Sequence, residues 1–414
     1  MNPEIDFSKF DILGEDITPL FNDLANKPAV HWNESSQVWV AGHHDAVVEG
    51  FSGKLPLSAE RHLIAIGVFP EEEHAIKAAN IAKYFPHFVT NVEPPEHSRL
   101  RKLLMAAFSK RIAEGYREVV REIVGRTVEQ LGNATQIDFV AQFARPVTVS
   151  TILHVMGLSP DFYADTERWA RALNEGLAGV PDPERIQKAD KAIGEMAGRF
   201  VPVIRERRAS GSQVRDFLGE LILAGEDGDR LSDEEIAAQM MLVIVAGHDT
   251  TLNTMALTIA KLSRHQEVAE YMRRNPDNFE QCIMELMRVV NMSTLMSRIV
   301  TADFTWHGQD LKAGQIVFLL IAGANRDPSV FAQPDKIDLD RSNQARNMTF
   351  APGRHFCIGH WFAKMIMSEA LPAFMGRFES WQVPVERLEF SNSIGFRGLV
   401  TLPLQLTPMR VEAW

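Results

Sequence analysis

The longest regular pattern of apolar positions in the chain runs from residue 233 to about residue 264. Apolar side chains recur there at helical spacing, and no proline interrupts them. The preceding Ser232-Asp233-Glu234-Glu235 has the Ser-x-x-Glu form of a capping box, which is typical of a helix N-terminus. A helix of this length would measure on the order of 50 Å, longer than most helices of globular proteins. We therefore expect one helix that crosses the whole molecule.

Near the middle of this predicted helix, the apolar run gives way to the polar residues His248, Asp249, Thr250 and Thr251. Thr250 in this position could simply bond back to a carbonyl oxygen one turn earlier. A carboxylate buried there, that of Asp249, would be costly without a functional role. The His248 imidazole could be a surface group on the far side of the helix, and we assign it no catalytic role.

Helical spacing also dominates most of the remaining chain. Residues 98–131 are predicted to form two consecutive helices that start just after Pro94-Pro95, and another helix is expected to begin at Asp45. Residues 138–208 are predicted to be helical with a break at 179–183. The alternation typical of strands is confined to short segments, at 28–41, 298–306, 316–320 and 399–406. The pattern predicts a mainly α fold with small β-sheets.

The composition of the 414 residues narrows the class of protein. No linker or low-complexity segment divides the chain, so we expect a single unit over residues 1–414. A net charge of −11 argues against a nucleic-acid partner, because duplex binding needs a basic face. The two cysteines, Cys282 and Cys357, fit a reducing compartment. Without a signal-peptide pattern or a long apolar run, we expect a cytoplasmic monomer with no membrane partner.

Cys357 is the main candidate for chemistry. It lies in a turn-prone segment, with Gly353 and Gly359 on either side and a helical run at 360–373 directly after it. A thiol at a helix N-terminus is favoured as the thiolate, which binds metals. Alternatively, a free cysteine can be a small buried hydrophobic residue.

The residues around Cys357 favour the metal-binding interpretation. The segment Phe350–Gly359 has the pattern Phe-x-x-Gly-x-His-x-Cys-x-Gly, which resembles the haem-binding loop of the cytochrome P450 monooxygenases. The resemblance implies that the Cys357 thiolate is the proximal ligand of haem iron. The cofactor-binding loop would comprise Phe350, Gly353, His355, Cys357 and Gly359. One residue departs from the pattern, because Ala351 stands where the family usually has glycine.

Four further segments match the same family in the same order along the chain. They are Glu93–Arg101, Ala246–Thr251, Glu285-x-x-Arg288 and Arg298. The resemblance implies that cationic side chains bind the haem propionates, namely His97, Arg101, Arg298 and His355. Within the central helix, it implies that Ala246 and Gly247 form the oxygen-binding groove, and that Asp249 and Thr250 deliver protons. Glu285 and Arg288 would lock the core near the ligand loop.

The resemblance also implies a fold and an activity. The fold would be that of cytochrome P450, a helix-rich lobe and a smaller β-rich lobe with haem b between them. The enzyme would be an oxidoreductase that inserts one atom of O2 into a C–H bond. The chain has no flavin, nicotinamide or iron–sulfur fingerprint, so we expect no fused reductase and a separate ferredoxin or flavodoxin with its reductase. The expected docking site for that partner is formed by Arg99, Lys102, Arg354 and Lys364.

By position against the family, the substrate pocket is expected to be mostly apolar. Its members would be Phe85, Phe88, Leu242, Val243, Ala246, Thr294, Leu295 and Phe396. Such a lining fits a small apolar substrate, for example a terpenoid, a steroid-like or an aromatic compound. Two other functions remain open at this point, a peroxide-driven haem-thiolate peroxygenase and a non-catalytic haem sensor.

Overall fold

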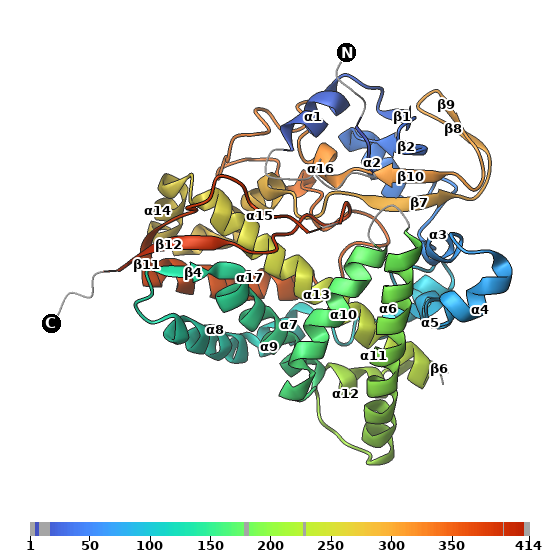
Figure 1. The fold of residues 1–414 in the computed structure, drawn as a ribbon, viewed down its shortest axis with the longest axis horizontal. Coiled ribbons are helices and arrows are strands. Elements are labelled where there is room, and N and C mark those ends of the chain that lie inside the picture. The colour runs from blue at the N-terminus through green and yellow to red at the C-terminus, as the bar shows by residue number, and fades with distance from the viewer. Residues whose placement is uncertain (1–4, 8–16, 178–181, 227–228, 392, 410–414) are drawn as a thin grey trace.

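Helix α13, Asp233–Leu262, crosses the centre of the molecule (Figure 1). The computed structural model describes residues 5–7, 17–177, 182–226, 229–391 and 393–409. The predicted capping box is present: Ser232 Oγ accepts a hydrogen bond from Glu235 N at 3.1 Å, and Glu235 Oε2 accepts one from Ser232 N at 2.7 Å. These bonds satisfy backbone N–H groups that a helix start leaves free. The prediction of one long central helix is confirmed.

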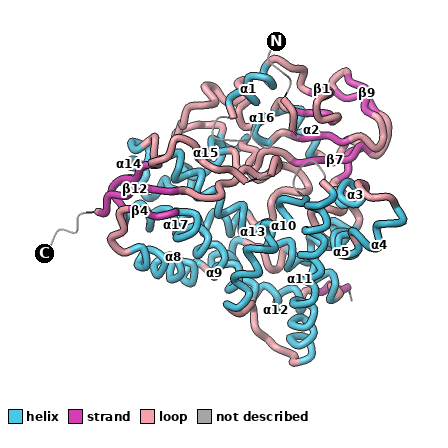
Figure 2. The backbone as a smooth tube through the Cα atoms, in the orientation of Figure 1, coloured by secondary structure: helices cyan, strands magenta, loops and turns pink. Residues whose placement is uncertain are grey.

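The described chain is mainly helical, and most of its strands lie towards the top and the left of the view (Figure 2). The helices other than α13 are α1 Thr18–Ala25, α2 His44–Phe51, α3 His62–Ile66, α4 His74–Lys77, α5 Ala79–Tyr84, α6 Glu96–Leu104, α7 Lys110–Gly115, α8 Arg117–Leu131, α9 Arg145–Met156, α10 Tyr163–Leu177, α11 Pro183–Ala209, α12 Phe217–Leu223, α14 Gln266–Arg274, α15 Phe279–Val290, α16 Ile321–Ala324 and α17 His360–Arg377. A π-helix, η4 Val140–Ala144, precedes α9, and the 3₁₀ helices are η2 Glu71–Glu73, η3 Phe85–His87, η5 Pro160–Phe162, η6 Pro276–Asn278 and η7 Gln344–Arg346. A mainly α fold with small sheets is therefore confirmed.

The strands form a five-stranded sheet and smaller ones. The large sheet has the order β1-β2-β10-β7-β3, β11-β12-β4 form a second sheet, and β5-β6 and β8-β9 are hairpins. Their bounds are β1 Val30–Asn33, β2 Val38–Ala41, β3 Leu57–Ser58, β4 Gln136–Asp138, β5 Gly225–Glu226, β6 Asp229–Arg230, β7 Met296–Val300, β8 Phe304–Trp306, β9 Gln309–Leu311, β10 Ile316–Leu319, β11 Phe378–Gln382 and β12 Pro403–Pro408. The predicted hairpin at 28–41 is confirmed as the antiparallel pair β1 and β2. Strand β10 pairs in parallel with β2 and antiparallel with β7, so the sheet joins the N-terminal hairpin to residues 296–319.

Two details differ from the sequence prediction. Residues 98–131 contain three helices rather than two, because Ser109 caps a separate helix α7 by accepting a hydrogen bond from Ile112 N. Helix α2 starts at His44, one residue before the predicted Asp45. Most of the predicted break at 179–183 lies outside the described residues, and α11 starts at Pro183.

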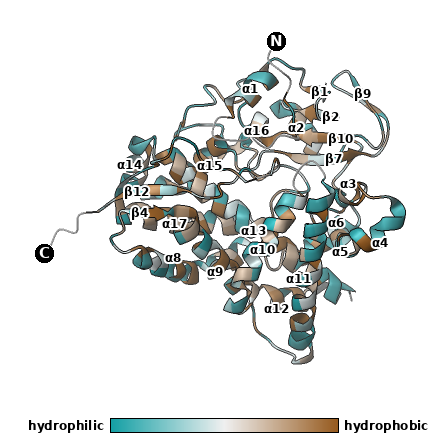
Figure 3. Ribbon diagram, in the orientation of Figure 1, coloured by the Kyte–Doolittle hydropathy of each residue, from teal (hydrophilic) through white to brown (hydrophobic). Residues whose placement is uncertain are grey.

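Helix α17 is held in an apolar core. Phe374 on this helix lies 4.9 to 5.7 Å, centroid to centroid, from four other aromatic rings, those of Phe139, Phe143, Phe378 and Trp381. Burying one such side chain contributes about 1.5–3 kcal/mol. Peripheral helices such as α8 and α11 carry both polar and apolar residues (Figure 3), as expected for helices with one face in water. The core fixes α17, and with it the Cys357 loop that enters this helix.

None of the helices in the described part of the chain is both long and apolar enough to cross a membrane.

Candidate functional site

A cavity of about 350 Å³ lies beside the middle of α13. Its lining includes Cys357 from the loop before α17, Thr250 from α13, Arg298 from β7 and Phe396 from the C-terminal segment. The structure therefore brings together segments as distant in the sequence as those of Phe51 and Phe396, as the family resemblance implied.

The loop that carries Cys357 is shaped by backbone hydrogen bonds and by two residues with positive φ. Cys357 N donates to Phe350 O at 2.9 Å, and Phe356 N donates to Gly353 O at 3.0 Å. Gly353 has a φ of 79°, and a Cβ there would lie 2.3 Å from Phe51 O, so no other residue fits without a shift. Ala351 has a φ of 49°, in the left-handed region where glycine is preferred.

The surroundings of the Cys357 thiol act on its pKa in opposite directions. Burial raises the pKa, whereas the N–H groups of Gly359 and His360 and the charge of Arg101 lower it. The loop and the helix N-terminus thus favour the thiolate, as predicted, but desolvation outweighs them. A metal cation at the sulfur would reverse this balance, since metal binding deprotonates a thiol.

At the middle of α13, Thr250 faces the cavity and its Oγ1 donates to Ala246 O, the back-bond expected for a threonine within a helix. Ala246 and Gly247 also line the cavity. A Cβ on Gly247 would lie 3.2 Å from Ile152 Cδ1 of α9, so this glycine also serves the close packing of two helices.

His248 is not a surface group, so that interpretation was wrong. Its side chain is only 1% exposed, and its two ring nitrogens lie 3.0 Å from Thr148 Oγ1 of α9 and 3.3 Å from Asp249 Oδ1. Asn174 Nδ2 of α10 donates to the second oxygen, Asp249 Oδ2, at 2.5 Å. Asp249 is also less buried than expected, with a side chain that is 24% exposed.

His248 and Asn174 thus fix both oxygens of the Asp249 carboxylate. Sequence reasoning missed both residues. The change from apolar to polar residues on α13 marked position 248, but no pattern in α10 pointed to Asn174, because its role depends on how two helices pack.

Two histidines meet on the side of the cavity near Cys357. The rings of His97 and His355 lie 4.4 Å apart, and the Nε2 atoms of both are buried without a hydrogen-bond partner among the described residues. Glu93 Oε1 is 3.7 Å from His355 Nε2, too far for a hydrogen bond. Burial, with the nearby His355 as the next cause, lowers the pKa of His97 to about 4.

Three arginines also line the cavity. Arg101 donates to Phe356 O at 2.9 Å, next to Cys357, and Arg298 lies 5.0 Å from the ring centroid of Phe51. The third, Arg61, was missed by sequence reasoning because it belongs to no recognised motif. Burial lowers the pKa of Arg61 to about 10 and that of Arg298 to about 9, with the charge of Arg61 contributing to the second shift.

Glu285 and Arg288 on α15 form a fully buried ion pair, 2.7 Å between Oε1 and NH2. Arg341 Nε adds a second contact to Glu285 at 3.1 Å. Arg288 NH1 also donates to the carbonyl oxygens of Asn325 and Pro334, at 2.8 Å each. The pair therefore ties α15 to the segment that leads into the Cys357 loop.

Most of the expected substrate residues line the cavity. They are Phe85, Phe88, Leu242, Val243, Ala246, Leu295 and Phe396. Thr294 does not belong to the lining: it is fully buried, and its N–H donates to Gly395 O at 2.9 Å. Its neighbours Ser293 and Leu295 reach the cavity instead, as the alternation of side chains along an extended segment requires.

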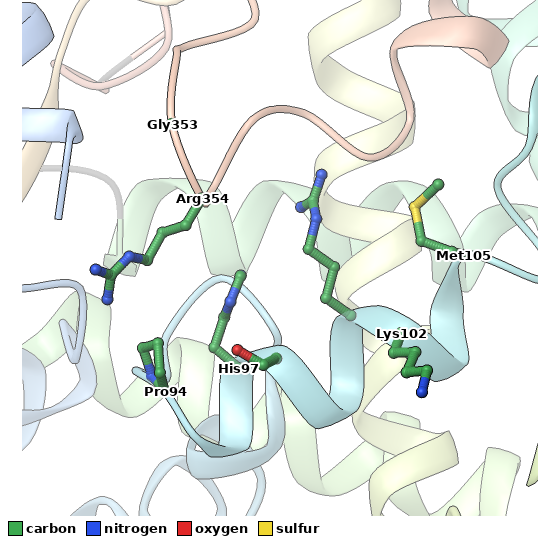
Figure 4. A pocket seen from close by; sticks show the side chains of 8 residues that line it. Pro94, His97, Lys102, Met105, Gly353 and Arg354 are labelled. Carbon is green, nitrogen blue, oxygen red and sulfur yellow. The ribbon is translucent and has the colours of Figure 1, made fainter. Parts of the chain in front are cut away.

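A second pocket opens between α6 and the Cys357 loop (Figure 4). Lys102 and Arg354 line it together with Met105, whereas Arg99 and Lys364 do not. Arg99 pairs with acidic residues, Glu96, Asp229 and Glu235, and Lys364 Nζ pairs with Glu280 at 2.9 Å. The structure thus gathers only two of the four expected docking residues in this pocket.

The geometry of the cavity agrees with comparisons to known proteins. The cytochrome P450 family model matches residues 177–406. The chain belongs to the cytochrome P450 family. Members of this family are haem-thiolate monooxygenases that hold haem b, so this P450 is an oxidoreductase with haem b as its cofactor.

Named relatives cover most of the chain. Polyketide biosynthesis cytochrome P450 PksS of Bacillus subtilis (strain 168) is 27% identical over 76% of each chain. The 6-deoxyerythronolide B hydroxylase of Saccharopolyspora erythraea is 26% identical over 82% of this chain and 80% of its own. The structure of CYP109E1 from Bacillus megaterium in complex with testosterone has a TM-score of 0.84 at 25% identity, covering 96% of this chain and 99% of that one. The structure of P450BioI with an acyl carrier protein has a TM-score of 0.87 at 22% identity, covering 96% and 99%, and shows the shared fold.

The residues around the cavity of this P450 fit haem b. Cys357 and His355 line the cavity, whereas His97 lies behind His355 and lines the second pocket, with its ring 4.4 Å from that of His355. The Nε2 atoms of both histidines are buried and have no hydrogen-bond partner among the described residues. Arg101 and Arg298 add permanent positive charge to the same wall. Buried cations and orphaned donors are what the two carboxylates of haem require.

Proposed function

We propose that this P450 hydroxylates a C–H bond of a small, largely apolar substrate. The observation that carries the proposal is that Cys357 and Thr250 line one cavity whose remaining wall is mostly aromatic and aliphatic. Haem held by a thiolate supplies the activation of dioxygen and cleavage of the O–O bond. The protein contributes binding, orientation and a controlled supply of protons.

For the cofactor, we propose that Cys357 is the iron ligand and that His97, Arg101, Arg298 and His355 bind the propionates. Phe350, Gly353 and Gly359 shape the loop around the sulfur. Glu285 and Arg288 keep that loop in place through the segment at 325–341, without touching the cofactor themselves.

For proton supply, we propose that Asp249 and Thr250 act in sequence. The Thr250 hydroxyl faces the cavity, and the adjacent Asp249 carboxylate is partly exposed. A hydrogen bond from Asn174 and the contact with His248 Nε2 at 3.3 Å hold that carboxylate in place, so a proton passed to the cavity would leave from a fixed group. The Ala246 and Gly247 backbone forms the floor beside Thr250.

For the substrate, we propose a terpenoid, a steroid-like or an aromatic compound. Phe85, Phe88, Leu242, Leu295 and Phe396 present apolar surface to the cavity. Apolar walls with a few polar contacts select apolar ligands and orient them. Relatives named for polyketide biosynthesis, for 6-deoxyerythronolide B and for a testosterone complex support a bulky ring compound.

For electrons, we propose a separate ferredoxin or flavodoxin with its reductase. The pocket in Figure 4 lies next to the Cys357 loop and carries the basic residues Lys102 and Arg354. An acidic redox protein would find complementary charge there despite the net charge of −11.

The test is a Cys357→Ser variant, with Cys282→Ser as a matched control, since Cys282 is buried in α15 and burial raises its pKa to about 11. The reduced wild type with carbon monoxide should show the absorption band of thiolate-ligated haem. Cys357→Ser should lose the band, and Cys282→Ser should keep it.

Survival of the band in Cys357→Ser would contradict the proposed ligand. Product analysis with apolar ring compounds then tests the reaction itself. Turnover driven by peroxide as fast as turnover with a reductase would identify a peroxygenase. A protein that binds such compounds tightly but oxidises none of them would be a haem sensor.

A further inference from the structure

Arg61 is a half-buried arginine whose exposed surface faces the cavity. It lies just before α3, and its contacts are with Thr90, Asn91 and Met296 rather than with the Cys357 loop. These contacts place it at the segments that follow Phe88 and Leu295, both of which line the cavity. Arg61 therefore lies where the Phe88 segment meets β7, and it is close enough to Arg298 for its charge to lower the pKa of that arginine.

The guanidinium of Arg61 is held in a fixed orientation. Its Nε donates to Asn91 Oδ1 at 3.0 Å, NH2 donates to Thr90 O at 3.1 Å, and NH1 lies 3.5 Å from Met296 Sδ. A guanidinium has five N–H donors. Two of them bond to oxygen atoms and one meets the weak sulfur acceptor of Met296, so about two remain free for a ligand. A fork fixed in this way is preorganised for a carboxylate.

The charges around the cavity do not balance without a further anion. Arg61, Arg101 and Arg298 carry permanent charge, and no aspartate or glutamate is among the described residues that line the cavity. The nearby Glu93 is already engaged, because it pairs with Arg354 at 2.8 Å and accepts a hydrogen bond from Ala59 N. The two propionates of haem would match two of the three arginines, which leaves one buried cation in need of an anion.

We propose that Arg61 binds the carboxylate of the substrate, which is then an acid with an otherwise apolar body. The stacked rings of Phe85 and Phe88, 4.4 Å apart, lie in the same segment as the Arg61 contacts and would hold that body. This inference deepens the proposed function and rests on it: the same cavity selects amphipathic acids over neutral compounds of the same shape.

The test uses probes that bind the haem iron directly, so that it does not depend on knowing the substrate. Imidazol-1-yl alkanoic acids of increasing chain length and their methyl esters are titrated into the holoenzyme, and the red shift of the Soret band gives Kd. At the best chain length, the wild type should bind the acid at least about tenfold more tightly than its ester, as a desolvated charge pair requires. An acid-to-ester ratio near one in the wild type would overturn the proposal without any variant.

Two variants of Arg61 and a control variant test whether Arg61 causes the preference for the acid over the ester. Arg61→Gln should bring the acid-to-ester ratio close to one without changing Kd for the ester, and Arg61→Lys should give an intermediate ratio because it keeps the charge but not the planar fork. The control is Arg346→Gln, which removes an exposed arginine outside the cavity lining that pairs with Asp45. It should leave the ratio unchanged.

The carboxylate that Arg61 binds could instead be a haem propionate, and the same Arg61→Gln variant distinguishes the two cases. In that case Arg61→Gln would speed haem transfer to apomyoglobin and leave the acid-to-ester ratio at its wild-type value, which would overturn the assignment to substrate. The absorption of the carbon monoxide complex is recorded in parallel. Loss of that band in the wild type would refute the proposed function, whereas an intact band with a ratio near one refutes only the role of Arg61.

Discussion

Ala351 holds a backbone conformation that glycine adopts more easily. At a φ of 49°, an alanine is strained by about 1–2 kcal/mol. A glycine avoids this strain but loses more backbone entropy on folding, which costs about 0.5–1 kcal/mol. We therefore expect Ala351→Gly to raise the free energy of unfolding by up to about 1 kcal/mol. Urea unfolding of the holoenzyme measures the change, and the carbon monoxide complex should keep its absorption band.

Gly353, two residues further on, provides the contrast within the same loop. Gly353→Ala would place a Cβ 2.3 Å from Phe51 O at a φ of 79°, so we expect a loss of at least about 2 kcal/mol. Equal effects of the two substitutions would show that backbone strain does not govern this loop.

His248 should make stability depend on pH. Burial lowers its pKa below the ordinary 6.5; Asp249 and the more distant Glu167 raise it, and Arg145 lowers it. Below pH 6.5 the unfolded chain takes up this proton while the folded protein does not. The free energy of unfolding should therefore fall as pH decreases from 6.5 towards the folded pKa, by up to about 1.4 kcal/mol per pH unit.

The His248→Gln variant should lack this part of the pH dependence, measured by urea unfolding between pH 7 and pH 5.5. His265, just before α14, offers a matched control, because it is half-buried and His265→Gln removes a histidine that pairs with the exposed Glu267. If the slopes of wild type and His248→Gln coincide, His248 does not titrate as its burial implies.

At the scale of elements, the pair of Glu285 and Arg288 determines how α15 holds the segment before the Cys357 loop. Both side chains are fully buried, and Arg341 shares the Glu285 carboxylate. Glu285→Gln leaves two buried guanidinium groups without a counter-charge, so we expect a loss of about 3–5 kcal/mol and faster release of haem. Thermal unfolding and haem transfer to apomyoglobin measure the two effects.

The exposed pair of Lys188 and Glu184 on α11 is a control with the same charges at i, i+4 spacing. Glu184→Gln should not change stability measurably, because solvent screens such a pair. A similar loss of stability in Glu285→Gln and Glu184→Gln would show that burial of the α15 pair does not increase its contribution to stability.

Elements defined by local signals could be predicted from the sequence, and elements defined by distant contacts could not. The Ser232 capping box and unbroken apolar spacing were enough for α13, and the short hairpin β1-β2 followed from alternation. The parallel pairing of β2 with β10 joins residues such as Trp39 and Val317, which no local pattern relates. Thr294 was misplaced for a related reason, because a shift of one residue in an extended segment turns a side chain away from the cavity.

The same distinction holds for the site. Motif residues such as Cys357 and Arg298 were found because a short pattern marks each of them, and both line the cavity. Arg61 and Asn174 were missed because each acts through a contact between separate elements. We propose that these unmarked residues serve substrate binding and proton supply, and we expect specificity to be set there.

At the scale of the whole molecule, a net charge of −11 would repel an acidic redox protein unless a local basic surface attracts it. Arg354 is a poor residue for testing this surface, because it pairs with Glu93 and donates to Gly53 O beside the cofactor loop. Lys102 lines the same pocket from α6 and is the better choice.

We expect Lys102→Glu to slow reduction by a ferredoxin about tenfold at low ionic strength, because a like charge would replace an attractive one at the contact. The difference should shrink as salt rises, since the Debye length falls to about 8 Å at 0.15 M. Stopped-flow reduction under carbon monoxide measures the rate, and the Soret shift with an imidazole probe should be unchanged.

Lys312→Glu is the matched control, because Lys312 is exposed, pairs with Asp303 and lies outside the pocket in Figure 4. Equal slowing by both variants would attribute the effect to net charge, and no slowing by Lys102→Glu would place the partner on another face.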